Sequence, residues 1–240
     1  MKKLLAFAAL WFHFLSSAHG QAPPADFTEK AQSFLRNYVA AGQVDYARVK
    51  AKLGEIESLH AQIGRMNLAQ ASDNSRKAFY INAYNLLVIY EVARRYPLKS
   101  VMDVSGFFDQ AKHQVAGEEL TLNALESSKL MKPYGDARLH FALACAAKGC
   151  PPLAGYAYLP EKLDAQLEER TRISLNNPYF IRVNNKQKKA EVSKIFQWYE
   201  KDFTGKGVSV PAFINQYRKE KIPAPYALDY YEYDWRLNGK

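Results

Sequence analysis

The spacing of hydrophobic positions predicts mainly helices in the first half of the chain. Residues 27–41 place their apolar side chains on one helical face, and Gly42 is a typical helix stop. A short extended segment at 44–46 and a second helix at 47–68 follow. The most apolar stretch comes next, at 78–93. Because charged residues flank it closely, we predict a core helix there and not a membrane span.

Shorter segments separated by turn signals make up the second half. Residues 112–121 predict a hairpin that turns at Gly117, and residues 122–131 predict a helix. The apolar run at 139–144 is too short for periodicity to distinguish a buried strand from a helical turn. The remaining predicted elements are a helix at 159–175, a hairpin of 180–183 with 190–193, helices at 195–203 and 211–219, and a closing strand at 230–237.

Helices and short strands are mixed without a repeating strand–helix–strand alternation. This order predicts an α+β fold, in which several helices pack on a small, mainly antiparallel sheet with hairpins.

The first residues have the pattern of a cleavable secretory signal. Two lysines precede an apolar run at 4–15, and Ala18 and Gly20 are the small residues that signal peptidase requires. The apolar run is shorter than the roughly 20 residues that span a bilayer. We therefore expect a soluble periplasmic or secreted protein with no membrane span after the signal is removed. The predicted parts are a signal peptide at 1–20, a loose leader at 21–26 and a single domain at 27–238.

Composition narrows the range of partners. A hydrophobic content of 48% with 13% aromatic residues is typical of a globular protein. The net charge of +9 favours anionic partners, yet the only dense basic cluster, at 186–189, is interpreted as the solvated tip of a hairpin. No nucleic-acid motif, serine-hydrolase elbow, zinc-protease motif, phosphate loop or dinucleotide fingerprint is present, and we expect no cofactor.

Two asparagines interrupt the apolar helix. Asn82 and Asn85 are three residues apart and therefore lie on one helical face. Burying an amide costs about 1–3 kcal/mol unless its hydrogen bonds are satisfied. We expect both side chains to bond backbone groups in the core, or else a ligand at the bottom of a cleft.

The only two cysteines, Cys145 and Cys150, lie close to His140. An oxidising compartment favours a disulfide between them, with His140 as a core residue. Alternatively, His140 acts as the base for a Cys145 nucleophile, although a separation of five residues does not place them together on a regular helix or strand. A metal site is the third possibility, but a fourth ligand is missing. We favour the disulfide and predict no metal site.

Glu126 lies in the predicted helix at 122–131. A surface ion pair with Lys129 is the simplest interpretation and contributes little stability. If Glu126 points inward instead, it needs a cationic or amide partner, for which Asn82 and Arg138 are the candidates.

The C-terminal part of the chain is rich in aromatic residues. Such spacing is more typical of a core than of a ligand site, and a carbohydrate platform requires several of these rings exposed on one side. The residues are Phe196, Trp198, Tyr199, Phe203, Tyr230, Tyr231, Tyr233 and Trp235.

Five blocks together resemble the domain-of-unknown-function 547 family. They are FYINAYNLLVIY, VAGEELTLNALE, DARLHFALACAAKGCPPL, IFQWYEKDF and YEYDWRLN, which occur in this order within roughly residues 30–238. The resemblance implies a common fold and a shortlist of motif positions, and it implies no reaction. The shortlist is Asn82, Tyr84, Asn85, Glu126, His140, Cys145, Lys148 and Cys150.

Two functions are compatible with these residues. We favour a recognition module for an envelope peptide, glycan or anionic polymer, because the chain is basic, aromatic-rich and lacks a standard catalytic motif. The alternative is a papain-like hydrolase or acyl transferase acting on peptide or cell-wall amides, with His140, Cys145 and Glu126 as catalytic residues. The candidate binding residues are Asn82, Tyr84, Asn85 and Lys148.

Overall fold

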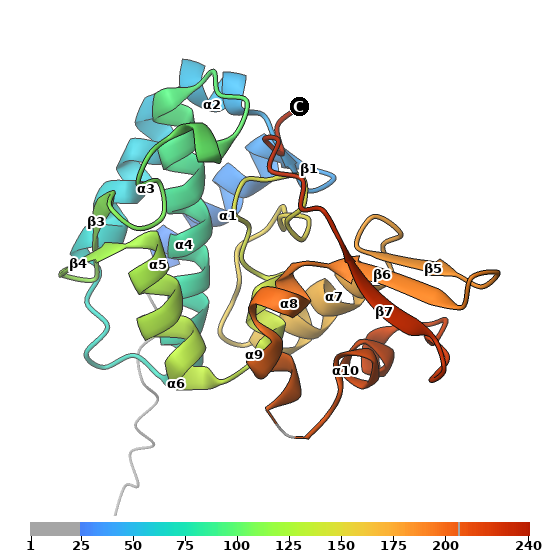
Figure 1. Cartoon of the computed structure of the whole chain (residues 1–240). Helices are drawn as coiled ribbons and strands as arrows, with labels where there is room; N and C mark the ends of the chain where they lie inside the picture. The colour runs from blue at the N-terminus through green and yellow to red at the C-terminus, as the bar shows by residue number, and fades with distance from the viewer. Residues whose placement is uncertain (1–24, 206) are drawn as a thin grey trace, which may run out of the picture.

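The computed structural model describes residues 25–205 and 207–240 (Figure 1). The predicted signal peptide at 1–20 and positions 21–24 of the predicted leader lie outside these residues. Helix α1 (Ala25–Tyr38) begins two residues earlier than predicted and ends before a small hairpin of β1 (Val39–Ala40) and β2 (Gln43–Val44).

Helix α4 (Asp73–Arg95) is the centre of the helical part of the molecule (Figure 1). Its first turn is capped by Ser72, whose hydroxyl accepts a hydrogen bond from the backbone N–H of Ser75. Helices α2 (Tyr46–Ala51) and α3 (Leu53–Arg65) pack against it. The sequence predicted one helix here, but the backbone of Lys52 leaves the helical conformation and divides it. Within the described residues, no helix combines the length and apolarity needed to cross a membrane.

The predicted hairpin at 112–121 is confirmed. Strands β3 (Lys112–Val115) and β4 (Glu118–Thr121) are antiparallel, and the turn uses positive φ angles at Ala116 and Gly117 (49° and 82°). The helical segment that follows is formed by α5 (Leu122–Ala124), the π-helical η2 (Leu125–Met131) and α6 (Lys132–Tyr134). A π-helix widens the backbone and is frequent at functional sites.

The second part of the molecule is built on a three-stranded sheet. Strand β6 (Lys189–Ser193) lies in the middle, antiparallel to β5 (Ile181–Asn184) and parallel to β7 (Ala227–Tyr231). The lysines at 186 and 188 are exposed in the turn between β5 and β6, as predicted. The helices of this second part are η3 (Ala137–Phe141), α7 (Leu163–Leu175), α8 (Ile195–Trp198), α9 (Glu200–Thr204) and α10 (Val210–Tyr217). The short helix η1 (Val101–Asp103) belongs to the first part.

The predicted closing strand at 230–237 is only partly correct. Strand β7 ends at Tyr231, and the chain then runs extended along the other elements, with isolated bridges at Arg236, Leu237 and Gly239. Figure 1 shows this last segment rising from β7 to end beside the β1–β2 hairpin. The open question about 139–144 is answered in part, since a 3-10 helix covers 137–141, whereas residues 143–144 have no regular secondary structure.

These elements confirm the predicted α+β fold of helices with small, mainly antiparallel sheets. Their apolar side chains form two clusters, one around α4 and one beneath the three-stranded sheet. The segment at 137–150 contributes residues to both clusters. It therefore connects the two halves of the molecule.

A buried polar cluster lies between α3, α4 and β3. His113 Nδ1 is 3.4 Å from His60 Nε2, and Glu91 is 2% exposed and pairs with Arg94 and Arg95. Burial lowers the pKa of His113 to about 4, although Glu91 opposes this effect. Burial also lowers the pKa of His60. The cluster therefore keeps His113 neutral in the folded state over a wide pH range.

We expect the protein to lose stability as the pH falls from 7 to 5. The unfolded chain protonates His113 near pH 6.5, whereas the folded chain resists protonation until about pH 4. No stability is therefore lost through His113 above about pH 6.5, and the loss grows as the pH falls below this value. At about 1.4 kcal/mol per pKa unit, the loss by pH 5 is about 2 kcal/mol. Urea unfolding should show a clearly smaller loss for His113→Phe, and equal losses would contradict the prediction.

Candidate functional site

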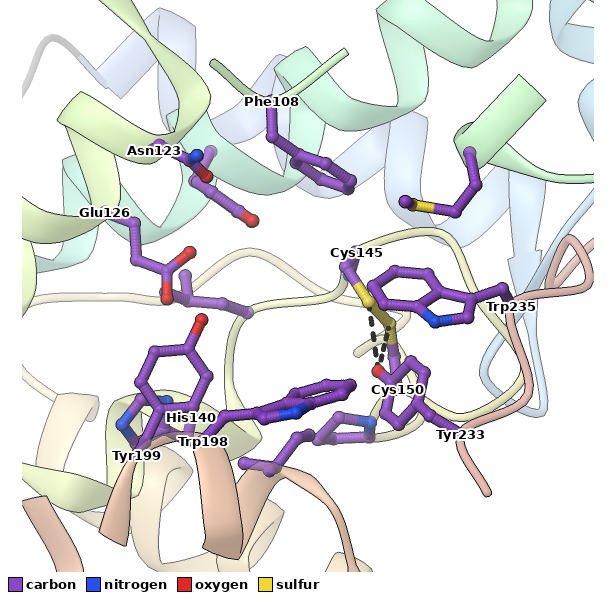
Figure 2. A pocket seen from close by; sticks show the side chains of 15 residues that line it. Phe108, Asn123, Glu126, His140, Cys145, Cys150, Trp198, Tyr199, Tyr233 and Trp235 are labelled. Atoms are coloured by element: carbon purple, nitrogen blue, oxygen red, sulfur yellow. Dashed lines mark hydrogen bonds between the residues drawn. A yellow bond between two sulfur atoms is a disulfide. The ribbon is translucent and has the colours of Figure 1, made fainter. Parts of the chain in front are cut away.

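A cavity of about 290 Å³ lies between the two hydrophobic clusters (Figure 2). Figure 2 shows Asn123 and Glu126 on one side, the two cysteines with Tyr233 and Trp235 on the other, and rings above and below. Aromatic side chains dominate the wall. They are Tyr84, Phe108, Trp198, Tyr199, Tyr233 and Trp235.

Several of these apolar side chains are accessible to solvent. Among the described residues, five large hydrophobic side chains are exposed, and three of them line this cavity: Met102 (58%), Trp198 (48%) and Tyr199 (39%). Exposed apolar surface that gathers at one concave place is typical of a ligand site.

Glu126 provides the acidic group of the cavity. It projects from the π-helical segment η2, and the Tyr84 hydroxyl is near enough to its carboxylate to affect its pKa. Burial raises the pKa of Glu126, while nearby His140 and the Tyr84 hydroxyl act in the opposite direction. Burial and Glu126 together raise the pKa of Tyr84 well above its usual value. Tyr84 therefore stays protonated.

The partners predicted for Glu126 are wrong. Lys129 pairs with Glu118 instead, because the β3–β4 hairpin brings that carboxylate to 2.7 Å. Arg138 is bound to Asp136, and Asn82 is bound to backbone groups, so neither is available. Tyr84, which the family resemblance placed on the shortlist in a different role, is instead among the groups that act on the pKa of Glu126.

His140 is held at the cavity by α9. Its Nε2 lies 2.8 Å from Asp202 Oδ2, and its ring packs 4.4 Å from Tyr199 and 5.1 Å from Phe203 between centroids. Burial and the neighbouring carboxylates of Glu126 and Asp202 raise the pKa of Tyr199 to about 12. The Tyr199 hydroxyl is therefore a hydrogen-bond donor at neutral pH.

Asn82 and Asn85 satisfy their hydrogen bonds inside the protein. Asn82 bonds both backbone groups of Tyr158 at 2.8 Å. Asn85 donates to the carbonyl of Ala142 and accepts from the N–H of Ala144, both at 2.9 Å. Neither amide lines the cavity. Asn85 instead fixes the backbone between His140 and the first cysteine.

Cys145 and Cys150 lie at disulfide distance, with their sulfur atoms 1.94 Å apart. The Tyr233 hydroxyl lies 3.1 Å from Cys145 Sγ and 3.3 Å from Cys150 Sγ (Figure 2). While this bond is closed, Cys145 has no thiolate to act as a nucleophile. Within the described residues, no group of three His, Cys, Asp or Glu side chains is arranged to hold a metal ion.

Lys148 lies outside the aromatic cavity. It is exposed and lines a neighbouring groove of about 570 Å³, which shares Cys150 and Pro151 with the aromatic cavity. The groove also contains Arg182 and Arg236 together with the acidic residues Glu232 and Asp234, so charges of both signs line it.

Some site residues were not predicted from the sequence. Asn123 lies three residues before Glu126 in a predicted helix, and this spacing could have indicated a common face. Met102, Phe108 and Asp202 carry no local signal, because their place at the site depends on contacts between distant segments.

A family model described as "Protein of unknown function, DUF547" matches residues 68–173. The chain resembles that family. The resemblance predicted from the five sequence blocks is therefore confirmed over this range. The DUF547 match includes Tyr84, Glu126, His140 and both cysteines, whereas the aromatic wall at 198–235 follows its end. No curated protein and no solved structure matches the chain.

Proposed function

We propose that this protein is an exported recognition module whose aromatic cavity binds a sugar ring of an envelope glycan. The observation that carries the proposal is the position of Trp198 and Tyr199, which are exposed over a cavity that also presents Asn123, Glu126 and His140. These two rings are exposed, and the half-buried rings of Phe108 and Trp235 extend the same cavity wall.

The chemistry of the wall matches that of a sugar. A pyranose ring has an apolar face of C–H groups, which packs on the electron-rich face of an aromatic ring. Its edge carries hydroxyl groups that need donors and acceptors. Asn123 supplies both, Glu126 is an acceptor when ionised, and the Tyr199 hydroxyl is a donor.

A neutral glycan fits this cavity better than an anionic polymer. Among the residues that the structure describes, no Lys or Arg lines the cavity, and Glu126 is an acidic group within it. An anionic ligand would meet this carboxylate in a partly desolvated site, where like charges repel strongly. The volume of about 290 Å³ is close to the lower end of small-ligand pockets, and this supports one ring more than a folded peptide segment.

Export is part of the same proposal. The signal-peptide pattern at 1–20 supports it. The paired cysteines support it as well, because disulfides persist mainly in oxidising compartments.

The alternative, a hydrolase or acyl transferase dependent on Cys145 and His140, stays a prediction with less support. It requires a free thiol at Cys145, whose sulfur is bonded to Cys150. The acceptor beside His140 Nε2 is Asp202 and not a sulfur atom.

Calorimetric titration with the tetramer of N-acetylglucosamine tests the proposal. We expect saturable binding that weakens about tenfold in Trp198→Ala, because the sugar loses a stacking surface worth about 1.4 kcal/mol. Tyr179→Ala is the matched control, since Tyr179 is 80% exposed but does not line the aromatic cavity. Its affinity should equal that of the wild type. Absence of binding, or equal affinity in Trp198→Ala, would contradict the proposal.

A further inference from the structure

The disulfide forms part of the cavity wall. Both cysteines line the cavity, and Figure 2 shows the sulfur–sulfur bond beside Trp235 and Tyr233. Cys145 is partly exposed, whereas Cys150 is only 7% exposed. Of the two residues, Cys145 is therefore the more exposed at the cavity.

The two sulfur atoms have different hydrogen-bond environments. The Tyr233 hydroxyl is shared, since it lies 3.1 Å from Cys145 Sγ and 3.3 Å from Cys150 Sγ. The backbone N–H of Cys145, by contrast, donates to Cys150 Sγ alone, at 3.0 Å. Burial raises the pKa of Tyr233, which keeps this hydroxyl protonated. Donors that point at a sulfur stabilise its thiolate, and a more stable thiolate leaves faster in disulfide exchange. Cys150 is therefore the better leaving group.

The loop that carries the disulfide is also held by backbone hydrogen bonds. The N–H groups of Lys148 and Gly149 donate to the carbonyls of Arg236 and Asp234 at 2.7 and 2.9 Å. The N–H of Asn238 donates to the carbonyl of Ala146 at 2.8 Å. These bonds do not involve the sulfur atoms. The loop can therefore keep its place when the disulfide opens. Opening it should also cost little free energy of unfolding, because so short a disulfide loop restricts the unfolded chain less than a long one does.

We propose that the Cys145–Cys150 disulfide is a thiol–disulfide exchange site for a small thiol that enters the aromatic cavity. The thiolate of the ligand attacks Cys145 Sγ and forms a new sulfur–sulfur bond. The Cys145–Cys150 bond breaks, and its electron pair leaves on Cys150 Sγ as a thiolate. A second thiol that attacks the mixed disulfide releases an oxidised ligand disulfide and leaves the protein as a dithiol.

The cavity wall defines the class of thiol. Its aromatic rings and the carboxylate of Glu126 favour an uncharged thiol with an apolar body over an anionic one. This exchange is separate from the proposed glycan binding. The sugar titration is carried out with the disulfide closed, so its result does not decide whether the disulfide opens.

The rate of disulfide opening in the folded protein tests the role of Cys150. With excess 2-mercaptoethanol at pH 7 and quenching by N-ethylmaleimide, we expect Tyr233→Phe to react about tenfold more slowly than the wild type, because the departing thiolate loses a donor. Tyr231→Phe is the matched control, since its hydroxyl bonds the carbonyl of Phe180, and its rate should be unchanged. A Tyr233→Phe rate equal to or above the wild-type rate, or a disulfide that opens only in denaturant, would overturn the proposal.

Mass spectrometry of the quenched wild type identifies the attacked sulfur. Lys148 lies between the two cysteines, so trypsin separates them into different peptides. We expect mercaptoethanol on the Cys145 peptide and N-ethylmaleimide on the Cys150 peptide. The reverse labelling would overturn the assignment.

Discussion

Replacing Asn85 with leucine is expected to lower the free energy of unfolding by about 3 kcal/mol. The amide is 3% exposed and satisfies the carbonyl of Ala142 and the N–H of Ala144. Leucine has a similar volume, so packing changes little, but both backbone groups lose their partner in the core. Each unpaired buried group costs about 1–3 kcal/mol. Urea unfolding monitored by circular dichroism at pH 7 measures the effect.

Asn123→Leu provides the control for this substitution. Asn123 has the same side chain but is exposed at the cavity, so its replacement should change the unfolding free energy by less than about 0.5 kcal/mol. If Asn85→Leu were as mild as Asn123→Leu, the two hydrogen bonds could not be what holds the backbone before Cys145.

The Asp136→Ala variant, which lacks this carboxylate, is expected to have a free energy of unfolding about 3 kcal/mol below that of the wild type. Asp136 Oδ2 lies 2.6 Å from Nζ of Lys77, and Arg138 donates two hydrogen bonds of 3.0 Å to the same carboxylate. Lys77 is 8% exposed, so the substitution leaves a nearly buried cation without its partner. Unfolding in urea at pH 7 is again the measurement.

The same carboxylate gives a second test through pH. Burial alone would raise the pKa of Asp136, but Arg138 and Lys77 outweigh burial and hold it at about 2. The stabilisation is therefore complete above pH 3.8 and disappears as the pH falls toward 2. Wild type should lose most of this contribution between pH 4 and pH 2.5, and Asp136→Ala should not. Asp164→Ala is the control for the substitution itself, because Asp164 also pairs with Arg138 but is 86% exposed. At pH 7 its free energy of unfolding should fall far less than that of Asp136→Ala, and an equal decrease would contradict the argument.

The parts of the fold that the sequence predicted well depend on local signals. These signals involve residues that are close together in the sequence. They are the apolar run at 78–93, the glycine at 117 and the spacing of Asn82 and Asn85. Helix α4, the β3–β4 hairpin and the buried amides follow directly from them. By contrast, the π-helical turn at Glu126 has no periodicity of its own, and the sequence predicted an ordinary helix.

The site itself was predictable only in part. Glu126, His140 and the cysteines were on the shortlist and do line one cavity. Their partners were not predictable, because His140 and Asp202 are 62 residues apart and Tyr233 is 83 residues from Cys150. Likewise, the aromatic spacing near the C-terminus does not reveal which rings face the core. Trp198 is exposed, whereas Phe196 is fully buried.

The extended segment after β7 has a consequence for the order in which the molecule can be completed. Tyr233 and Trp235 form one wall of the cavity, and Asn238 accepts a hydrogen bond from Tyr46, 192 positions earlier in the chain. Contacts so distant in sequence form late, since the whole intervening chain must first be brought together. A chain that has not yet gained residues 233–240 therefore lacks both this wall and the contact with Tyr46, and its cavity is unfinished.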